Sequence, residues 1–183
     1  MASPLSKAQI KTVEKIHAEF AKEAGAYFTE IYGQVVDFEI GFVDQTTFAE
    51  YIMSLKNPTG SYTFNIHPWE GPATIDYSPG VYNCFLSKAM GKEIDGPLAD
   101  DTREFMAKIC VKNLAQLEKA WEPIDKINVT DATVETNPIE NTIVAPSTTV
   151  LLIGFEFNGP KHSAILSVVY PLPTIESILP KLG

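Results

Sequence analysis

The chain has 183 residues, of which 45% are hydrophobic and 20% charged, and its formal net charge at pH 7 is −9. This length predicts one globular domain with a sizeable core, and the acidic balance argues against nucleic-acid or anionic-membrane binding, since both need clustered Lys and Arg. No apolar run approaches the roughly 20 residues that span a bilayer, and the N-terminus lacks the regions of a secretory signal, so we expect a cytoplasmic protein.

The first half of the chain is predicted to form a helix, a strand, a short helix, a hairpin and a second short helix. These elements are expected at Ser6–Ala24, Val35–Val43, Phe48–Leu55, Ser61–His67 with Ala73–Tyr77, and Val81–Lys88. Ser6 is the expected N-cap of the first helix. In the first strand the apolar residues alternate, as side chains on one strand face do; they are Val36, Phe38, Ile40 and Phe42. Because the chain starts almost directly on a helix, we expect it to be a segment excised from a longer protein.

The second half repeats this order after a loop, Gly91–Pro97, that has no apolar periodicity. The expected elements are Thr102–Trp121, Ile127–Val134, Asn137–Val144, Val150–Phe157 with Ala164–Tyr170, and Thr174–Lys181. Asp100 or Asp101 is the expected cap of the long helix. The strand that contains Val150–Ile153 is apolar at nearly every position, which predicts burial on both faces.

The hairpin regions themselves form an internal repeat. Pro58, Gly71-Pro72 and Pro79 punctuate the first copy, and Pro146, Gly159-Pro160 and Pro171 punctuate the second. A repeat near half the chain length predicts two similar units that share one core, at about residues 6–90 and 99–183 of a single domain. We therefore expect an α/β protein of the α+β type. It would be a pseudo-two-fold α/β/α sandwich, in which two helix-strand-helix-hairpin-helix halves share a six-stranded, mostly antiparallel sheet.

Residues typical of catalysis or metal binding form no recognisable pattern. The histidines (His17, His67 and His162) are far apart in the sequence, and there is no paired His or Cys spacing and no glycine-rich phosphate loop. Cys84 and Cys110 lie within apolar helical patterns and are predicted to be buried hydrophobic residues. We expect no catalytic residue, no cofactor and no metal.

Several phrases of the sequence, in order along nearly the whole chain, resemble the middle domain of the flagellar motor switch protein FliM. They are Phe48–Thr59, Gly71-Pro72-Ala73, Trp121-Glu122-Pro123, Glu135-Thr136-Asn137-Pro138 and Ile143-Val144-Ala145-Pro146. The resemblance implies a non-enzymatic module of the switch ring, in the flagellar basal body at the cytoplasmic face of the inner membrane. The implied partners are FliG, neighbouring FliM copies and phosphorylated CheY, together with FliN, which would bind through a C-terminal domain that is missing here.

The resemblance also implies two kinds of contact site. In the family a Gly-Gly-x-Gly loop contacts FliG; the matching residues here are Ala89, Met90, Gly91, Lys92, Glu93 and Ile94, with one glycine retained. Neighbouring copies of the family meet through the first helix of one copy and the short second-half helix of the next. The corresponding self-association residues are Lys7, Lys11 and Lys15 on one side and Asn137, Glu140 and Asn141 on the other.

The alternative is a phosphatase of the CheC and FliY type with an altered active site. Those relatives carry Asp/Ser-x-x-x-Glu-x-x-Asn on their long helices, where the Asn amide positions the attacking water. Here Asp100 and Glu104 match the start of the motif, but the Asn position is Ala107. On the first helix Glu14 is followed three residues later by His17, at the position where the motif has Asn. This departure favours a scaffold over an enzyme.

Overall fold

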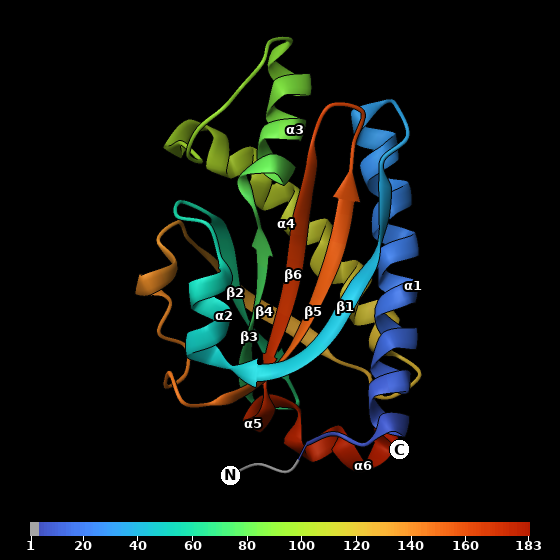
Figure 1. Ribbon diagram of the computed structural model, residues 1–183. Helices are drawn as coiled ribbons and strands as arrows, with labels where there is room; N and C mark the ends of the chain where they lie inside the picture. The colour runs from blue at the N-terminus through green and yellow to red at the C-terminus, as the bar shows by residue number, and fades with distance from the viewer. Residues whose placement is uncertain (1–3) are drawn as a thin grey trace.

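The computed structural model describes residues 4–183 (Figure 1). The first half contains α1 (Lys7–Tyr32), β1 (Asp37–Thr47), α2 (Phe48–Ser54), β2 (Gly60–His67), β3 (Gly71–Tyr77) and α3 (Pro79–Met90). The second half contains α4 (Asp100–Trp121), β4 (Asn128–Glu135), η1 (Pro138–Glu140), β5 (Thr149–Asn158), β6 (Ser163–Pro171), α5 (Leu172–Ile175), η2 (Glu176–Ile178) and α6 (Leu179–Leu182).

All six strands form one sheet in the order β1-β5-β6-β3-β2-β4, and every neighbouring pair is antiparallel. The two hairpins meet at the centre, where β3 pairs with β6. Each outer strand belongs to the opposite half, because β1 pairs with β5 and β4 pairs with β2. The strand order is therefore symmetric: exchanging the equivalent strands of the two halves (β1 with β4, β2 with β5, β3 with β6) gives the same order read from the opposite edge. The predicted pseudo-two-fold fold class is therefore confirmed.

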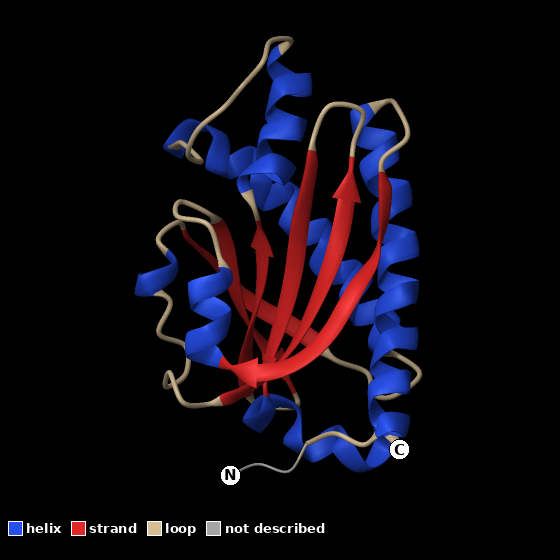
Figure 2. Ribbon diagram, in the orientation of Figure 1, coloured by secondary structure: helices blue, strands red, loops and turns tan. Residues whose placement is uncertain are grey.

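Helices lie on both faces of the sheet, as expected, but they cover the faces unequally (Figure 2). The main core lies between one face and the long helices α1 and α4, and it contains the aromatic residues Phe20, Phe28, Phe38, Phe155 and Phe157. On the second face α2 packs over a small cluster that includes Phe48, Tyr51 and Val150. Part of the second face thus stays uncovered beside α2.

The first helix is longer than predicted. Ser6 caps it as expected, through a reciprocal pair of hydrogen bonds with Gln9. The helix continues past Ala24 and ends where Gly33 adopts a left-handed conformation (φ 86°) and its N–H bonds to the Thr29 carbonyl. Gly25 lies inside the helix, where the backbone passes close to Phe38 on β1. The predicted end at Ala24 is therefore too early, because Gly25, which is normally unfavourable within a helix, is part of α1.

Three predictions about the second half are wrong in detail. The segment Asn137–Val144 is helical only in the single turn η1; after it, Asn141 turns inward and the chain runs on without helix. The segment Thr174–Lys181 is divided among α5, η2 and α6, with a proline near the start of the first and last pieces, because proline interrupts the helical hydrogen-bond pattern. The N-cap of α4 is Ala99, and Asp100 instead pairs with Arg103 at 3.4 Å.

Candidate partner-binding surfaces

The loop predicted to bind a partner projects from the end of α3. The helix ends at Gly91, whose backbone is left-handed (φ 69°), and an added Cβ there would meet nothing within 4 Å. Ala89, Met90, Gly91, Lys92 and Glu93 are exposed, and Ile94 is half-buried. The Ser87 hydroxyl accepts a hydrogen bond from the Ile94 N–H (2.8 Å) and donates one to the Ile94 carbonyl (3.3 Å). The loop is therefore both accessible and anchored to its helix.

Two connections from distant parts of the sequence meet this loop at the same end of the molecule (Figure 1). Glu93 lies 3.2 Å from Nε2 of His162 in the turn between β5 and β6. The Lys88 ammonium lies 5.6 Å from the ring centre of Tyr32, at the end of α1. Together the three connections line a hollow of about 350 Å³. Neither Tyr32 nor His162 can be assigned to this surface from the sequence, since neither belongs to a local motif.

The three lysines predicted to take part in self-association (Lys7, Lys11 and Lys15) are exposed along the first turns of α1. This end of the helix is tied to the C-terminal segment: Thr12 donates to the Leu182 carbonyl (2.7 Å) and Gln9 to the Leu179 carbonyl (3.0 Å). A rigid helix end therefore presents the three positive charges.

The other self-association residues lie beside an apolar groove of about 680 Å³ between α2 and residues 139–146. Met53 and Ile139 stand at this groove with 85% and 74% of their surfaces exposed. Glu140 is exposed, and Asn137 is half-buried. Asn141 is buried, and its amide bonds to the Thr74 hydroxyl (3.4 Å), so its side chain points into the molecule. The sequence alone does not distinguish Met53 and Ile139 from core residues, because a lone apolar residue on a short element fits either place.

The two self-association sets lie on opposite sides of the molecule (Figure 1). The helix α1 forms one side, while α2 and the orange turn η1 form the other. One copy therefore cannot bring the sets together, whereas two copies placed side by side in the same orientation can. Such a head-to-tail arrangement extends into a ring or a filament.

The positions that correspond to phosphatase residues offer no catalytic arrangement. Glu104 is exposed on α4, and Ala107 has no side-chain amide that could hold a water. On α1, His17 is fully buried, and this burial lowers the pKa of its imidazole to about 4. Among the side chains that the structure describes, no group of three or more His, Cys, Asp or Glu is placed to hold a metal, and no described helix is long and apolar enough to cross a membrane. Cys84 and Cys110 are buried and unpaired, as predicted.

Comparisons with known proteins agree on one family. The sequence model described as "Flagellar motor switch protein FliM" matches residues 6–183. The chain is 28% identical to the FliM of Thermotoga maritima and 26% identical to that of Borreliella burgdorferi. These alignments cover 99% and 97% of this chain, and 56% and 52% of the two relatives. The chain thus spans about half the length of the curated relatives it matches.

Solved structures show the same fold. The fold matches a chain in the crystal structure of the FliG–FliM complex from H. pylori with a TM-score of 0.91 at 23% identity, covering 96% of this chain and 100% of that one. It also matches the crystal structure of Thermotoga maritima FliY with a TM-score of 0.83 at 12% identity, covering 98% of both chains.

Proposed function

The chain belongs to the family of the flagellar motor switch protein FliM, and we propose that it serves as a non-enzymatic scaffold and signalling domain of the motor switch. In this role it binds FliG, neighbouring FliM copies and phosphorylated CheY at the cytoplasmic face of the inner membrane, and it helps to set the direction of rotation. FliN is reached through another part of the full-length protein. The observation that carries the proposal is the placement of three accessible surfaces on a single body, with the α3 loop at one end and the two self-association sets on opposite sides.

The residues at the motif positions support a role without phosphatase activity. Ala107 has no group to orient water, and the imidazole of His17 is inaccessible. A scaffold can still transmit a signal, because a bound regulator need only prefer one of two arrangements of rigid neighbours. Phosphate release from phosphorylated CheY separates this role from that of a CheC- or FliY-type phosphatase, since only a phosphatase accelerates it.

FliG binding is proposed for the loop Ala89–Ile94, supported by its exposure and by the FliG–FliM complex of the H. pylori relative. We expect Lys92→Glu to weaken binding of the FliG middle domain by about tenfold, because it reverses a charge at the centre of the loop. The fold should be unaffected, since Lys92 is exposed. Isothermal titration calorimetry measures the affinity, and thermal unfolding checks stability.

The matched control is Lys126→Glu, which makes the same charge change on an exposed residue between α4 and β4. It should leave the affinity for FliG unchanged. If Lys92→Glu and Lys126→Glu bind FliG equally well, the contact lies elsewhere on the molecule.

Self-association is proposed to join the lysine side of α1 in one copy to the α2–η1 side of the next, where Glu140 supplies an opposite charge. Cysteines introduced at Lys11 and Glu140 should cross-link between molecules in assembled rings and give a ladder of oligomers on non-reducing gels. Cys84 and Cys110 are buried, so they should contribute little background. A cysteine at Lys126 paired with one at Glu140 is the control. Equal ladders from both pairs would contradict this interface.

A further inference from the structure

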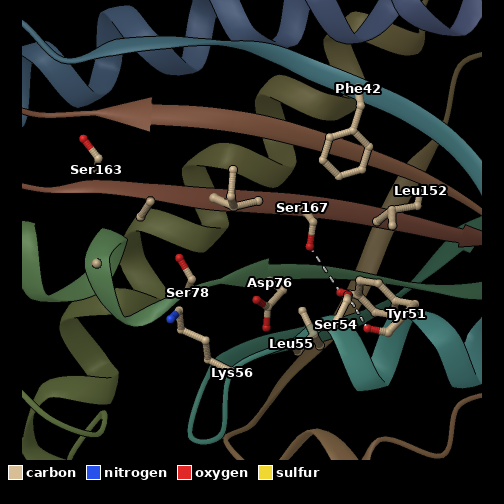
Figure 3. Close-up of a pocket in the computed structure, with 13 residues that line it drawn as sticks. Phe42, Tyr51, Ser54, Leu55, Lys56, Asp76, Ser78, Leu152, Ser163 and Ser167 are labelled. Atoms are coloured by element: carbon tan, nitrogen blue, oxygen red, sulfur yellow. Dashed lines mark hydrogen bonds between the residues drawn. The ribbon is translucent and has the colours of Figure 1, made fainter.

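The second face of the sheet contains a pocket of about 430 Å³ beside α2, separate from the partner-binding surfaces (Figure 3). Its walls are mainly apolar and include Phe42, Leu55, Leu152 and Ile165. Polar side chains line it from β3, β6, α2 and the start of α3; they are Asp76, Ser167, Tyr51 and the α3 N-cap Ser78. This volume and this mixture of apolar walls with a few polar groups are typical of small-molecule sites.

The chain builds one wall of the pocket by an irregularity in β1. The pairing of β1 with β5 shifts register between Ile40 and Phe42, and the extra residue of such a bulge re-aims the side chains that follow it. Phe42 consequently faces the second side of the sheet, where its ring lies over Gly154. A side chain at position 154 would occupy the space of that ring, so glycine is needed there for the wall to form.

Asp76 is the unusual residue of this pocket. It is only 2% exposed, yet no Lys, Arg or His among the described residues forms an ion pair with it. Its carboxylate accepts hydrogen bonds from the Thr59 hydroxyl (2.7 and 2.9 Å) and the Ser61 hydroxyl (2.6 Å). Burial raises the pKa of this carboxyl, and the two hydroxyls partly oppose that rise. A buried carboxylate without a cation is costly, and it can accept more hydrogen bonds than these two hydroxyls supply.

A second polar atom of this pocket also lacks a partner. The Ser78 hydroxyl oxygen is buried and makes no hydrogen bond, and Figure 3 shows Ser78 on the same side of the pocket as Asp76. An ammonium group carries a positive charge and three N–H donors, which match a carboxylate and a hydroxyl oxygen that line the same pocket. The apolar walls would take a short hydrocarbon or aromatic body attached to that ammonium.

We propose that this pocket is a binding site for a small organic cation, a primary ammonium with a compact apolar body. The ammonium binds Asp76 and Ser78, and the body packs against Phe42, Leu152 and Ile165. Lys56 also lines the pocket and is exposed, and Figure 3 shows its amine turned toward Ser78, so its positive charge opposes the ligand. The site goes beyond the scaffold role, and its test does not depend on FliG, CheY or ring assembly.

The test is an NMR titration of the ¹⁵N-labelled chain at pH 7 with 2-phenylethylamine, compared with 2-phenylethanol, which has a similar shape but no charge. We expect saturable shifts of backbone amides around Ser78, Ile165 and Ser167 with the amine, and at least about tenfold weaker binding of the alcohol. Equal affinities for the two probes, shifts centred elsewhere, or no saturation by about 10 mM amine would overturn the proposal.

Two variants that change opposite charges sharpen the test. Asp76→Asn should weaken amine binding by about tenfold and leave alcohol binding unchanged, whereas Lys56→Met should strengthen amine binding. Because Lys56 is exposed, its replacement should leave the fold intact. Lys56→Met therefore still tests the proposal if Asp76→Asn fails to fold. Undiminished amine binding by a folded Asp76→Asn chain, or no gain in Lys56→Met, would overturn the assigned position of the ammonium.

Discussion

Replacement of Phe155 by alanine is expected to lower the free energy of unfolding by about 3–5 kcal/mol. The side chain is fully buried on β5, between the edge strand β1 and β6, and it packs against α1 and β1. Its ring is stacked on that of Phe38 (centroids 5.1 Å apart) and meets that of Phe20 edge-on (5.4 Å). Truncation leaves a cavity that these rings cannot close without leaving their own partners. Urea unfolding followed by circular dichroism measures the loss, which is a large part of the stability of a typical domain.

The control for this prediction is Phe42→Ala, the same substitution on the neighbouring strand. Phe42 lies on the second face with 44% of its surface exposed, so less apolar area returns to water and no closed cavity forms. We expect a loss under about 1.5 kcal/mol. Similar losses for the two variants would show that the aromatic cluster between α1 and β5 is not the main source of stability.

Acidification from pH 6.5 to pH 4 is expected to cost about 3 kcal/mol of unfolding free energy through His17 alone. Burial lowers the pKa of this imidazole from 6.5 to about 4. The stability is fully present above pH 6.5 and falls as the pH drops toward 4, because over this range the unfolded chain binds a proton that the folded chain does not. Unfolding free energies measured at intervals between pH 7 and pH 4 give the slope.

The hydrogen bonds of His17 explain why the folded protein resists this proton. Nδ1 lies 2.8 Å from the Val13 carbonyl, and Nε2 lies 2.8 Å from the Tyr170 hydroxyl, which also accepts a bond from the Trp121 N–H (3.0 Å). A neutral imidazole fits this chain, donating from Nδ1 and accepting at Nε2. A second proton on Nε2 would face the Tyr170 oxygen, which already accepts a bond, and the tyrosine hydrogen would lose its acceptor.

His17→Gln isolates this effect, because it removes the titrating group while the rest of the chain is unchanged. The variant should lose most of the slope between pH 6.5 and pH 4, whatever its absolute stability. Asp76 acts in the opposite direction, since burial raises its pKa, and it is present in both proteins. His67→Gln, at an exposed position, should keep the full slope. If His17→Gln keeps it as well, the acid sensitivity arises elsewhere.

The sheet and the long helices could be predicted from the sequence because their signals are periodic. The two hairpins are bounded by Pro and Gly, and the confirmed N-cap at Ser6 is followed by an uninterrupted apolar stripe. The end of α1 was misplaced at Ala24 because Gly25 is normally unfavourable within a helix. Here glycine is accommodated by the close approach of Phe38, a tertiary contact that a local pattern does not contain.

The surfaces were harder to predict than the fold. Alternation placed Phe42 with Phe38 on one face, and only the bulge in β1 sends its side chain to the other. Asn141 fits a short exposed helix in the sequence, yet it is buried against Thr74. His162 meets Glu93 only after the β5–β6 turn has folded beside the α3 loop. In each case the position of the side chain depends on a contact with a residue that is remote in the chain, and sequence periodicity carries no information about such contacts.

The exchange of outer strands between the two halves has a consequence for synthesis on the ribosome. Strand β1 ends at Thr47, but its pairing partner β5 begins only at Thr149. At about 5–20 residues per second, translation leaves β1 without that partner for roughly 5–20 s. During this interval the nascent first half can close its own β2–β3 hairpin, while β1 presents an unpaired edge that other chains can join. Neither half contains the pairing partner of its own outer strand, so a chain truncated before β5 would leave β1 unpaired, and an unpaired strand edge favours aggregation.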